Sequence, residues 1–185
     1  MSLHVIGIAG SLRAGSFNRG LLAAAPAIAP AGMTIEIADL RPIPFFDGDV
    51  EAAGLPPAVA DLKARVRGAG ALLIATPEYN YSVPGVLKNA LDWLSRGPDS
   101  ALAGKPAAVM GASPGGFGTV RAQLALRQVA LGTNLLLLQR PEVHVAKAAE
   151  KFDAQGRLTD EGVRKNLAAL LAALGDWARL HLAGA

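Results

Sequence analysis

Five apolar runs separated by helix-like segments constrain this chain more than any other feature. The runs occupy residues 3–9, 33–38, 69–75, 106–112 and 135–139. Most are continuously apolar rather than alternating, which is typical of strands covered by helices on both faces. Helical segments are expected between and after them, at about 17–29, 57–67, 83–95, 119–131 and 160–182. The alternation predicts an α/β fold built on a parallel sheet.

Right-handed crossovers between such strands give a doubly wound sheet. Five strands fit the flavodoxin-like order 2-1-3-4-5, whose switch point lies between strands 1 and 3. Ligands bind outside the carboxyl ends of strands at a switch point. We therefore expect a single domain over residues 1–185, with helices on both faces and a site where the loops after strands 1 and 3 meet. Residues 40–57 are expected to form one long surface loop.

The helix ends carry recognisable signals. Thr159 is the expected N-cap of the last helix, with Asp160 and Glu161 in a first turn that favours acidic side chains. Gly132 is the expected C-cap of the preceding helix.

Composition excludes several classes of function. Cysteine is absent, so disulfides, thiolate catalysis and the usual zinc sites are excluded. The net charge is +3, but the basic residues are scattered and aromatic residues make up 5% of the chain, which argues against nucleic-acid binding. No run approaches the roughly 18 apolar residues of a membrane span. The N-terminus resembles no secretory signal, so we expect a cytoplasmic protein.

The loop after the first strand, residues 10–18, suits a phosphate group. Ser11, Ser16 and Asn18 offer polar side chains, and backbone N–H groups lead into a helix. Arg13 adds a planar fork of donors and a full charge. The alternative is that Ser16 only caps the helix and Arg13 only solvates a turn.

The same loop lacks the three glycines of the dinucleotide fingerprint G-x-G-x-x-G. Asp39 stands at the end of strand 2, where that fingerprint would place an acidic ribose ligand. Without the glycines, we interpret Asp39 as a turn or capping residue.

The loops after strands 3 and 4 suit a flat ring. Pro77 and Pro84 stiffen the first of them, so that the N–H groups from Glu78 to Asn80 can hold fixed directions. Glycines in the segment 113–118 allow the backbone to approach a planar ligand closely. Fixed N–H groups beside a ring that gains negative charge on reduction would stabilise the reduced form.

Each of these features also has a purely structural interpretation. Tyr79 and Tyr81 could anchor their loop, Glu78 could be a solvated acid, and the glycines could form a turn. Trp93 is expected in the core or at a subunit interface, and the three histidines are expected to be structural or exposed. No Ser/His/Asp arrangement is legible, so we assign no catalytic side chain and no metal ligand.

Three segments together resemble the NADPH-dependent FMN reductase family, which includes bacterial quinone and chromate reductases. They are Gly-Ser-Leu-Arg at 10–13 with Ser16 and Asn18, Thr-Pro-Glu-Tyr-Asn at 76–80, and Val-Pro-Gly-Val-Leu-Lys-Asn-Ala-Leu-Asp-Trp at 83–93. The match covers nearly the whole chain, with the motifs in the family's order.

The resemblance implies a flavodoxin-like fold with non-covalently bound FMN. It places Ser11, Arg13, Ser16, Phe17 and Asn18 around the FMN phosphate. The isoalloxazine ring would lie against a second set, Pro77, Glu78, Tyr79, Asn80 and Tyr81. Its other edge would be lined by Ser113, Gly115, Gly116 and Phe117.

The activity implied is hydride transfer from NADPH or NADH through FMN to a quinone, free flavin, azo compound or metal oxyanion. The alternatives are a flavodoxin-type electron carrier and a flavin-free regulatory or binding protein. Similar proteins form homodimers or homotetramers. Where some relatives carry a tyrosine that joins dimers, this chain has Leu124, so we expect at least a dimer and leave the tetramer open.

Overall fold

The computed structural model describes residues 2–182 and contains a parallel sheet. The long strands are β1 Leu3–Ala9, β2 Met33–Ala38, β3 Ala71–Ala75 and β4 Pro106–Ala112, and the short ones are β5 Leu136–Leu137 and β6 Val143–Val145. Their order is β2-β1-β3-β4-β5, with β6 also paired to β4. The expected doubly wound order is therefore confirmed.

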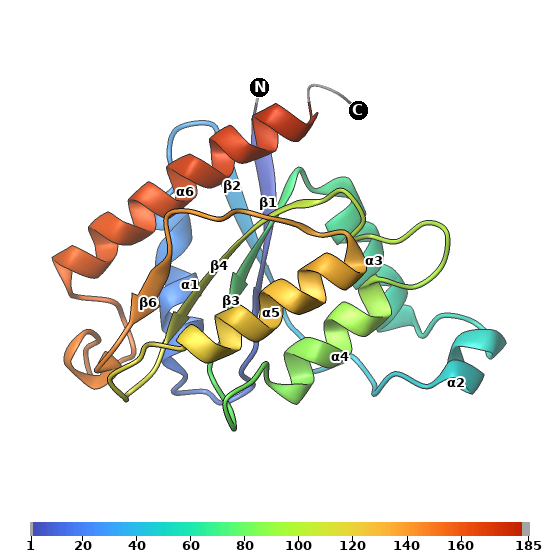
Figure 1. Ribbon diagram of the computed structural model, residues 1–185, viewed down its shortest axis with the longest axis horizontal. Coiled ribbons are helices and arrows are strands. Elements are labelled where there is room, and N and C mark those ends of the chain that lie inside the picture. Colours follow the sequence, from blue (N-terminus) through green and yellow to red (C-terminus); the bar gives the residue numbers. More distant parts are fainter. Residues whose placement is uncertain (1, 183–185) are drawn as a thin grey trace.

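Helices cover both faces of this sheet (Figure 1). They are α1 Phe17–Ile28, α2 Gly48–Ala53, α3 Pro57–Gly68, α4 Gly85–Leu94, α5 Val120–Thr133 and α6 Glu161–Leu182, with a 3₁₀ turn at Ala148–Glu150. Alternate strand residues point to opposite layers. Val5 and Leu73 pack in the core under α1 and α6, whereas Ile6 and Leu72 pack under α3, α4 and α5. This two-sided burial explains why the runs are continuously apolar.

The fifth strand position differs from the expectation of one strand at 135–139. Two short strands occupy it, with β5 pairing the start of β4 and β6 pairing its end. The link between them contains Pro141, which has no N–H to donate to a ladder. The apolar run therefore predicted only the first half of this position.

Two expected caps and one loop also need correction. Asp160 rather than Thr159 caps α6, because its Oδ1 accepts from the Val163 N–H at 2.8 Å. Helix α5 continues past Gly132 to Thr133, and its C-cap is Asn134, which adopts the left-handed conformation with φ 54°. The segment 40–57 is not one continuous loop, since it contains α2. Helix α2 has no buried residue and projects away from the sheet (Figure 1).

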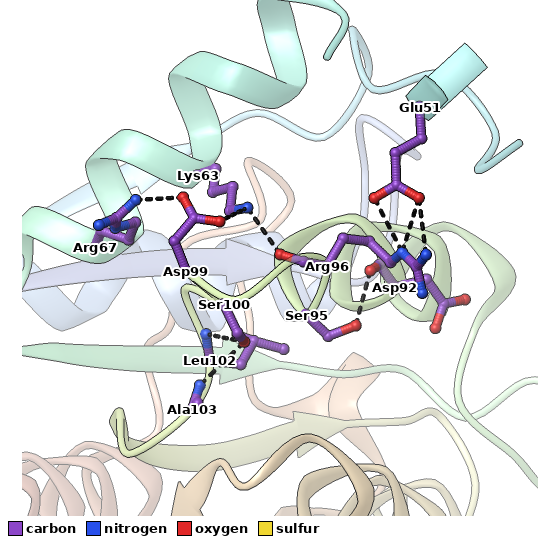
Figure 2. Close-up of polar contacts among 10 residues, drawn as sticks. All are labelled: Glu51, Lys63, Arg67, Asp92, Ser95, Arg96, Asp99, Ser100, Leu102 and Ala103. Atoms are coloured by element: carbon purple, nitrogen blue, oxygen red, sulfur yellow. Dashed lines mark hydrogen bonds and ion pairs between the residues drawn. The ribbon is translucent and has the colours of Figure 1, made fainter. Parts of the chain in front are cut away.

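Ion pairs fix the connection from α4 to β4 (Figure 2). Lys63 on α3 is buried, and its Nζ donates to Asp99 Oδ1 at 2.9 Å and to the Arg96 carbonyl at 2.8 Å. Arg67 contacts the other oxygen of Asp99, and Arg96 pairs with Glu51 on α2. Residues 96–105 lead from the end of α4 to the start of β4, whereas the loops after β1, β3 and β4 leave the opposite ends of those strands. Among residues 2–182, no helix combines the length and apolar character needed to cross a membrane.

Candidate functional site

The loop after β1 leads into the first turn of α1, where two backbone N–H groups have no acceptor in the described chain. Ser16 caps the helix, its Oγ accepting from the Arg19 N–H at 3.4 Å. The N–H groups of Phe17 and Asn18 find no acceptor within residues 2–182, and the first turn holds no acidic residue. The positive end of the helix dipole is thus uncompensated, which suits an anion. Ser16 has the expected capping role, and this role leaves its hydroxyl hydrogen free to donate.

The loops after β1 and β3 touch. Ser11 Oγ lies 3.3 Å from the Tyr79 hydroxyl, a hydrogen bond between residues far apart in the sequence. The Gly10 N–H donates to the Ala75 carbonyl at 2.9 Å. A Cβ added at Gly10 would lie 3.2 Å from Pro77 Cδ, so glycine allows this close approach. The expected meeting of the two loops is therefore present in the structure.

The segment 79–82 forms a tight turn at the tip of its loop. Tyr79 and Ser82 form an antiparallel bridge, and Asn80 and Tyr81 between them adopt φ values of 49° and 67°. A turn of this kind favours asparagine and glycine, so a tyrosine in the left-handed region costs on the order of 1–3 kcal/mol. The Tyr79 N–H is used within the turn, whereas those of Glu78 and Asn80 have no acceptor in the described chain.

Glu78 joins this loop to α5. Its Oε2 accepts from the N–H groups of Arg121 and Ala122 at 3.0 and 3.2 Å, and its Oε1 accepts from Arg121 Nε at 2.5 Å. The Glu78 side chain is only 10% exposed. The carboxylate therefore acts as a capping group for α5 rather than as the solvated acid considered from the sequence.

Arg121 was not singled out as a site residue from the sequence. Its guanidinium carbon lies 3.8 Å from the centroid of the Tyr81 ring and 5.0 Å from that of Phe117. Both rings are largely exposed. The result is a platform of one cation between two aromatic rings, held in place by Glu78. Tyr81 and Phe117 were expected at the site, whereas Arg121 reaches them only through tertiary folding, 43 residues from Glu78 in the sequence, so no local pattern marks it.

The loop after β4 is held against β6 and the 3₁₀ turn. The Ser113 N–H donates to the Val145 carbonyl, the Gly115 N–H donates to Ser113 Oγ at 3.0 Å, and the Lys147 N–H donates to the Gly115 carbonyl. A Cβ added at Gly116 would meet nothing within 4 Å, so the backbone there is open to a ligand. At Gly118, with φ 56°, it would lie 2.7 Å from the backbone of His144, so this position requires glycine.

Asn18 fastens α1 to the end of β4. Its Nδ2 donates to the Ala112 carbonyl at 2.8 Å and its Oδ1 accepts from the Ala112 N–H at 2.9 Å. Asn18 is 3% exposed. Its side chain thus positions the loop, and the N–H of its backbone is the group left for a ligand.

A cavity of about 330 Å³ lies between the three loops. Most of the expected site residues line it, namely Ser11, Arg13, Ser16, Phe17, Asn18, Pro77, Glu78, Tyr79 and Ser113. Ala112 and Pro114 also line it and were not expected. The remaining expected residues, Asn80, Tyr81, Gly115, Gly116 and Phe117, are exposed and do not line the cavity. Trp93 is fully buried and donates to the Pro44 carbonyl at 2.9 Å, which confirms its core position.

Asp39 has the turn role expected from the sequence. Its Oδ1 accepts from the Arg41 N–H at 3.1 Å, and both carboxylate oxygens accept from the Arg41 guanidinium. These bonds, with a further attraction to Arg19, lower the pKa of Asp39 despite the opposing effect of burial. Arg41 also donates to the Leu12 carbonyl at 3.0 Å, and this bond connects the end of β2 to the loop after β1.

Comparison with known proteins identifies the family of this chain. The profile of the NADPH-dependent FMN reductases matches residues 3–150. An NAD(P)H-dependent FMN reductase of Pseudomonas aeruginosa is 51% identical, with 96% of each chain covered. A quinone reductase of Escherichia coli K12 is 42% identical, with 95% of each covered. The solved structure of FerB, a flavoenzyme NAD(P)H:(acceptor) oxidoreductase from Paracoccus denitrificans, superposes with a TM-score of 0.88 at 35% identity, covering 97% of this chain and 98% of that one. This chain belongs to the NADPH-dependent FMN reductase family.

Proposed function

We propose that this protein is an FMN-dependent NAD(P)H oxidoreductase that reduces a small-molecule acceptor, such as a quinone, free flavin, azo compound or metal oxyanion. The observation that carries the proposal is the Ser11–Tyr79 contact, which joins a loop suited to phosphate and a loop suited to a ring around one cavity. The relatives named FMN reductase and quinone reductase support the same activity.

The residues at the phosphate end fit the FMN phosphate. Arg13 is exposed and lines the cavity, and no hydrogen bond or ion pair within residues 2–182 involves its side chain. The open N–H groups of Phe17 and Asn18 and the hydroxyl of Ser16 add neutral donors. A phosphate monoester carries about −1.5 to −2 charges near neutral pH. One full positive charge and a helix N-terminus therefore match its charge and its need for donors.

The residues at the other end fit a planar ring. Pro77 is buried against Gly10 and limits the freedom of the backbone before Glu78 and Asn80, whose N–H groups remain open. The exposed backbone of Gly115 and Gly116 offers a second edge without side chains in the way. Tyr79, Tyr81 and Phe117 supply ring contacts. We therefore keep these residues as the proposed FMN contacts.

FMN, when bound, supplies hydride acceptance from NAD(P)H and onward reduction of the acceptor. With a quinone the overall change is NAD(P)H, one proton and quinone to NAD(P)⁺ and hydroquinone. The protein's part is to hold the cofactor in position and to aim fixed N–H donors at the ring. No side chain is required as a nucleophile or as a base.

An anaerobic spectral titration tests this function. The purified protein is mixed with FMN, freed of excess flavin, and treated with NADPH or NADH in the absence and presence of a quinone. We expect the retained flavin bands to bleach with the reduced nucleotide and to return with the quinone, over many turnovers. An electron carrier would not turn over under these conditions, and a protein that retains no FMN would contradict the proposal.

Arg13→Ala tests the phosphate end. Because a hydrogen bond to a charged group contributes about 1.5–3 kcal/mol, FMN affinity should fall about 10- to 150-fold. Riboflavin lacks the phosphate, so its affinity should not change in the same variant. Arg179→Ala, in the last turn of α6, removes the same charge from a mostly exposed position and serves as the control. Equal losses for FMN and riboflavin would exclude Arg13 from the phosphate site.

We also propose one FMN-binding domain, a cytoplasmic location and a homodimer or homotetramer. Helix α4 offers no free apolar face for such an interface, because its apolar residues are buried in the core or packed against it. Exposed apolar side chains stand at Leu124 and Leu131, seven residues apart on α5, and at Phe117 in the loop before that helix. Exposed apolar side chains on one helix face support self-association, and light scattering after size exclusion would give the assembly's mass.

A further inference from the structure

A second and larger cavity adjoins the loop after β1. Its volume of about 780 Å³ lies within the range of small-molecule sites. The start of α1, the carboxyl end of β2 and the segment 153–158 enclose it. It shares three lining residues, Ser11, Ser16 and Phe17, with the smaller cavity between the three loops. A ligand held at this shared wall can therefore extend into both cavities.

The segment 153–158 forms an ordered wall of the larger cavity. Phe152 and Leu158 form an antiparallel bridge that closes this segment into a hairpin. A Cβ added at Gly20 of α1 would clash with the Gly156 carbonyl oxygen, so the hairpin lies close to the helix because Gly20 has no side chain. The cavity is thus formed before any ligand enters, and binding need not order this segment.

One arginine of the cavity carries a charge without a partner. Arg19 lines the larger cavity and not the smaller one, and it is half-buried. No hydrogen bond or ion pair within residues 2–182 involves its side chain. The two acids of the lining are already neutralised, since Asp39 pairs with Arg41 at 3.1 Å and Asp153 pairs with Arg157 at 2.7 Å. Arg19 is therefore free to bind an anion in this cavity.

Another part of the cavity is apolar. Leu12, from the loop after β1, and Ile37, from β2, both line it and are 42% and 45% exposed. Half-exposed aliphatic side chains in a cavity provide the contact that a flat heterocycle needs. Together with Arg19, they suit a heterocyclic base that is joined to a phosphate.

The shared wall is also the place that the proposed function gives to the FMN phosphate, beside the Ser16 hydroxyl and the Phe17 N–H. A group attached to one oxygen of that phosphate has the larger cavity next to it. FAD is FMN with adenosine monophosphate attached at this position. Its pyrophosphate carries one negative charge on each phosphorus, which matches Arg13 on one side of the wall and Arg19 on the other.

We propose that the larger cavity binds the adenosine monophosphate half of FAD, so that the protein accepts FAD as well as FMN. The adenine lies against Leu12 and Ile37, and the adenosine phosphate lies beside Arg19. This assignment rests on the proposed function, because it needs the flavin phosphate at the shared wall. Side chains rather than a glycine-rich turn hold the pyrophosphate, so the fingerprint G-x-G-x-x-G is not required.

Calorimetric titration of the flavin-free protein with FMN and with FAD tests the proposal without any turnover. The FAD is freed of FMN beforehand, and chromatography of the bound flavin shows that it stays intact. We expect FAD to bind within about tenfold of FMN, because the charged bond to Arg19 offsets the smaller charge beside Arg13. An FAD affinity more than about tenfold below that of FMN would overturn the proposal.

A bulky side chain on α1 locates the adenosine. Ala23 is exposed and lines the larger cavity but not the smaller one, whereas Ala27, one turn later, is exposed and lines neither. Ala23→Trp should therefore weaken FAD binding at least about tenfold and leave FMN binding unchanged. Ala27→Trp is the matched control and should leave both affinities unchanged.

Removing the free charge locates the second phosphate. Arg19→Gln should weaken FAD binding about 10- to 150-fold, the range for charged hydrogen bonds, and leave FMN binding unchanged. Arg179→Gln, in the last turn of α6, is the control for loss of one charge and should change neither affinity. Circular dichroism and the unchanged FMN affinity show that each variant is folded. Equal losses for FMN and FAD in both Ala23→Trp and Arg19→Gln, or no loss of FAD binding in either, would overturn the assignment.

FMN binding separates this assignment from the proposed function. A protein that binds FMN and turns over, yet discriminates strongly against FAD, would overturn the cavity assignment alone. A protein that binds neither flavin would instead contradict the FMN-dependent activity on which the assignment rests.

Discussion

Removing the Glu78 carboxylate should loosen the site and lower the stability of the whole fold. The carboxylate accepts two N–H bonds at the start of α5 and one from Arg121 Nε, in a position that is 10% exposed. Loss of a helix cap costs about 0.5–2 kcal/mol and loss of a charged hydrogen bond about 1.5–3 kcal/mol. Because these contacts share one group, we expect Glu78→Ala to cost about 2–4 kcal/mol rather than their sum.

Urea denaturation of Glu78→Ala, Arg121→Met and the double variant measures this cost. In thermal denaturation, each kcal/mol shifts the melting temperature of a chain of this size by roughly 2–4 °C, so that of Glu78→Ala should fall by about 4–16 °C. The two substitutions should couple by about 1–2 kcal/mol, because each single variant leaves the other charge without its partner. Glu78→Gln keeps an acceptor for the cap and should show a smaller loss. A change below about 0.5 kcal/mol for Glu78→Ala would show that the carboxylate does not cap α5 in solution.

Three further substitutions test other contacts. Tyr79→Phe removes the hydroxyl that bonds to Ser11 in the loop after β1, so FMN binding should weaken about 2- to 12-fold. Tyr81→Phe loses no such bond and should bind FMN as the parent protein does. Quenching of FMN fluorescence measures both affinities. Gly111→Ala would place a Cβ against the Thr119 hydroxyl and 2.5 Å from the Thr76 carbonyl oxygen. Urea denaturation should therefore show a free energy of unfolding lower by about 1–3 kcal/mol. The hydrogen bond from Lys63 lowers the pKa of Asp99, so this pair stabilises the fold above the ordinary carboxyl pKa of about 3.9, and the stabilisation is lost as the pH falls through the lowered pKa. In Asp99→Asn the free energy of unfolding should therefore fall less steeply at acid pH than in the parent protein. An unchanged acid dependence would contradict the pairing.

The sheet could be predicted because it is a property of local sequence. Continuous apolar runs identify strands buried on both faces, and the polar loops after β1 and β3 follow them directly. Parallel strands bring these loops to one edge, so the contact between Ser11 and Tyr79 follows from topology. The fifth strand position could be read only in part, because β6 is three residues long and includes His144.

The details of the site depend on tertiary approach and could not be predicted. Glu78 and Arg121 are 43 residues apart, and nothing near either one indicates that the carboxylate caps the helix of the other. Asn18 was expected as a ligand from its place in the motif, yet both ends of its side chain are bonded to Ala112. Asp160 and Thr159 are both good caps, but the Thr159 hydroxyl donates to the Lys151 carbonyl, a tertiary contact that leaves Asp160 to cap α6.

The account's central claim is that the loops after β1, β3 and β4 hold one FMN between them. A crystal structure of the protein with FMN tests it most directly. The claim predicts the phosphate beside Arg13 and the first turn of α1, with the ring against residues 77–81 and the backbone of 115–117. FMN found in the larger cavity beside β2, or on a surface that leaves these loops free, would contradict it.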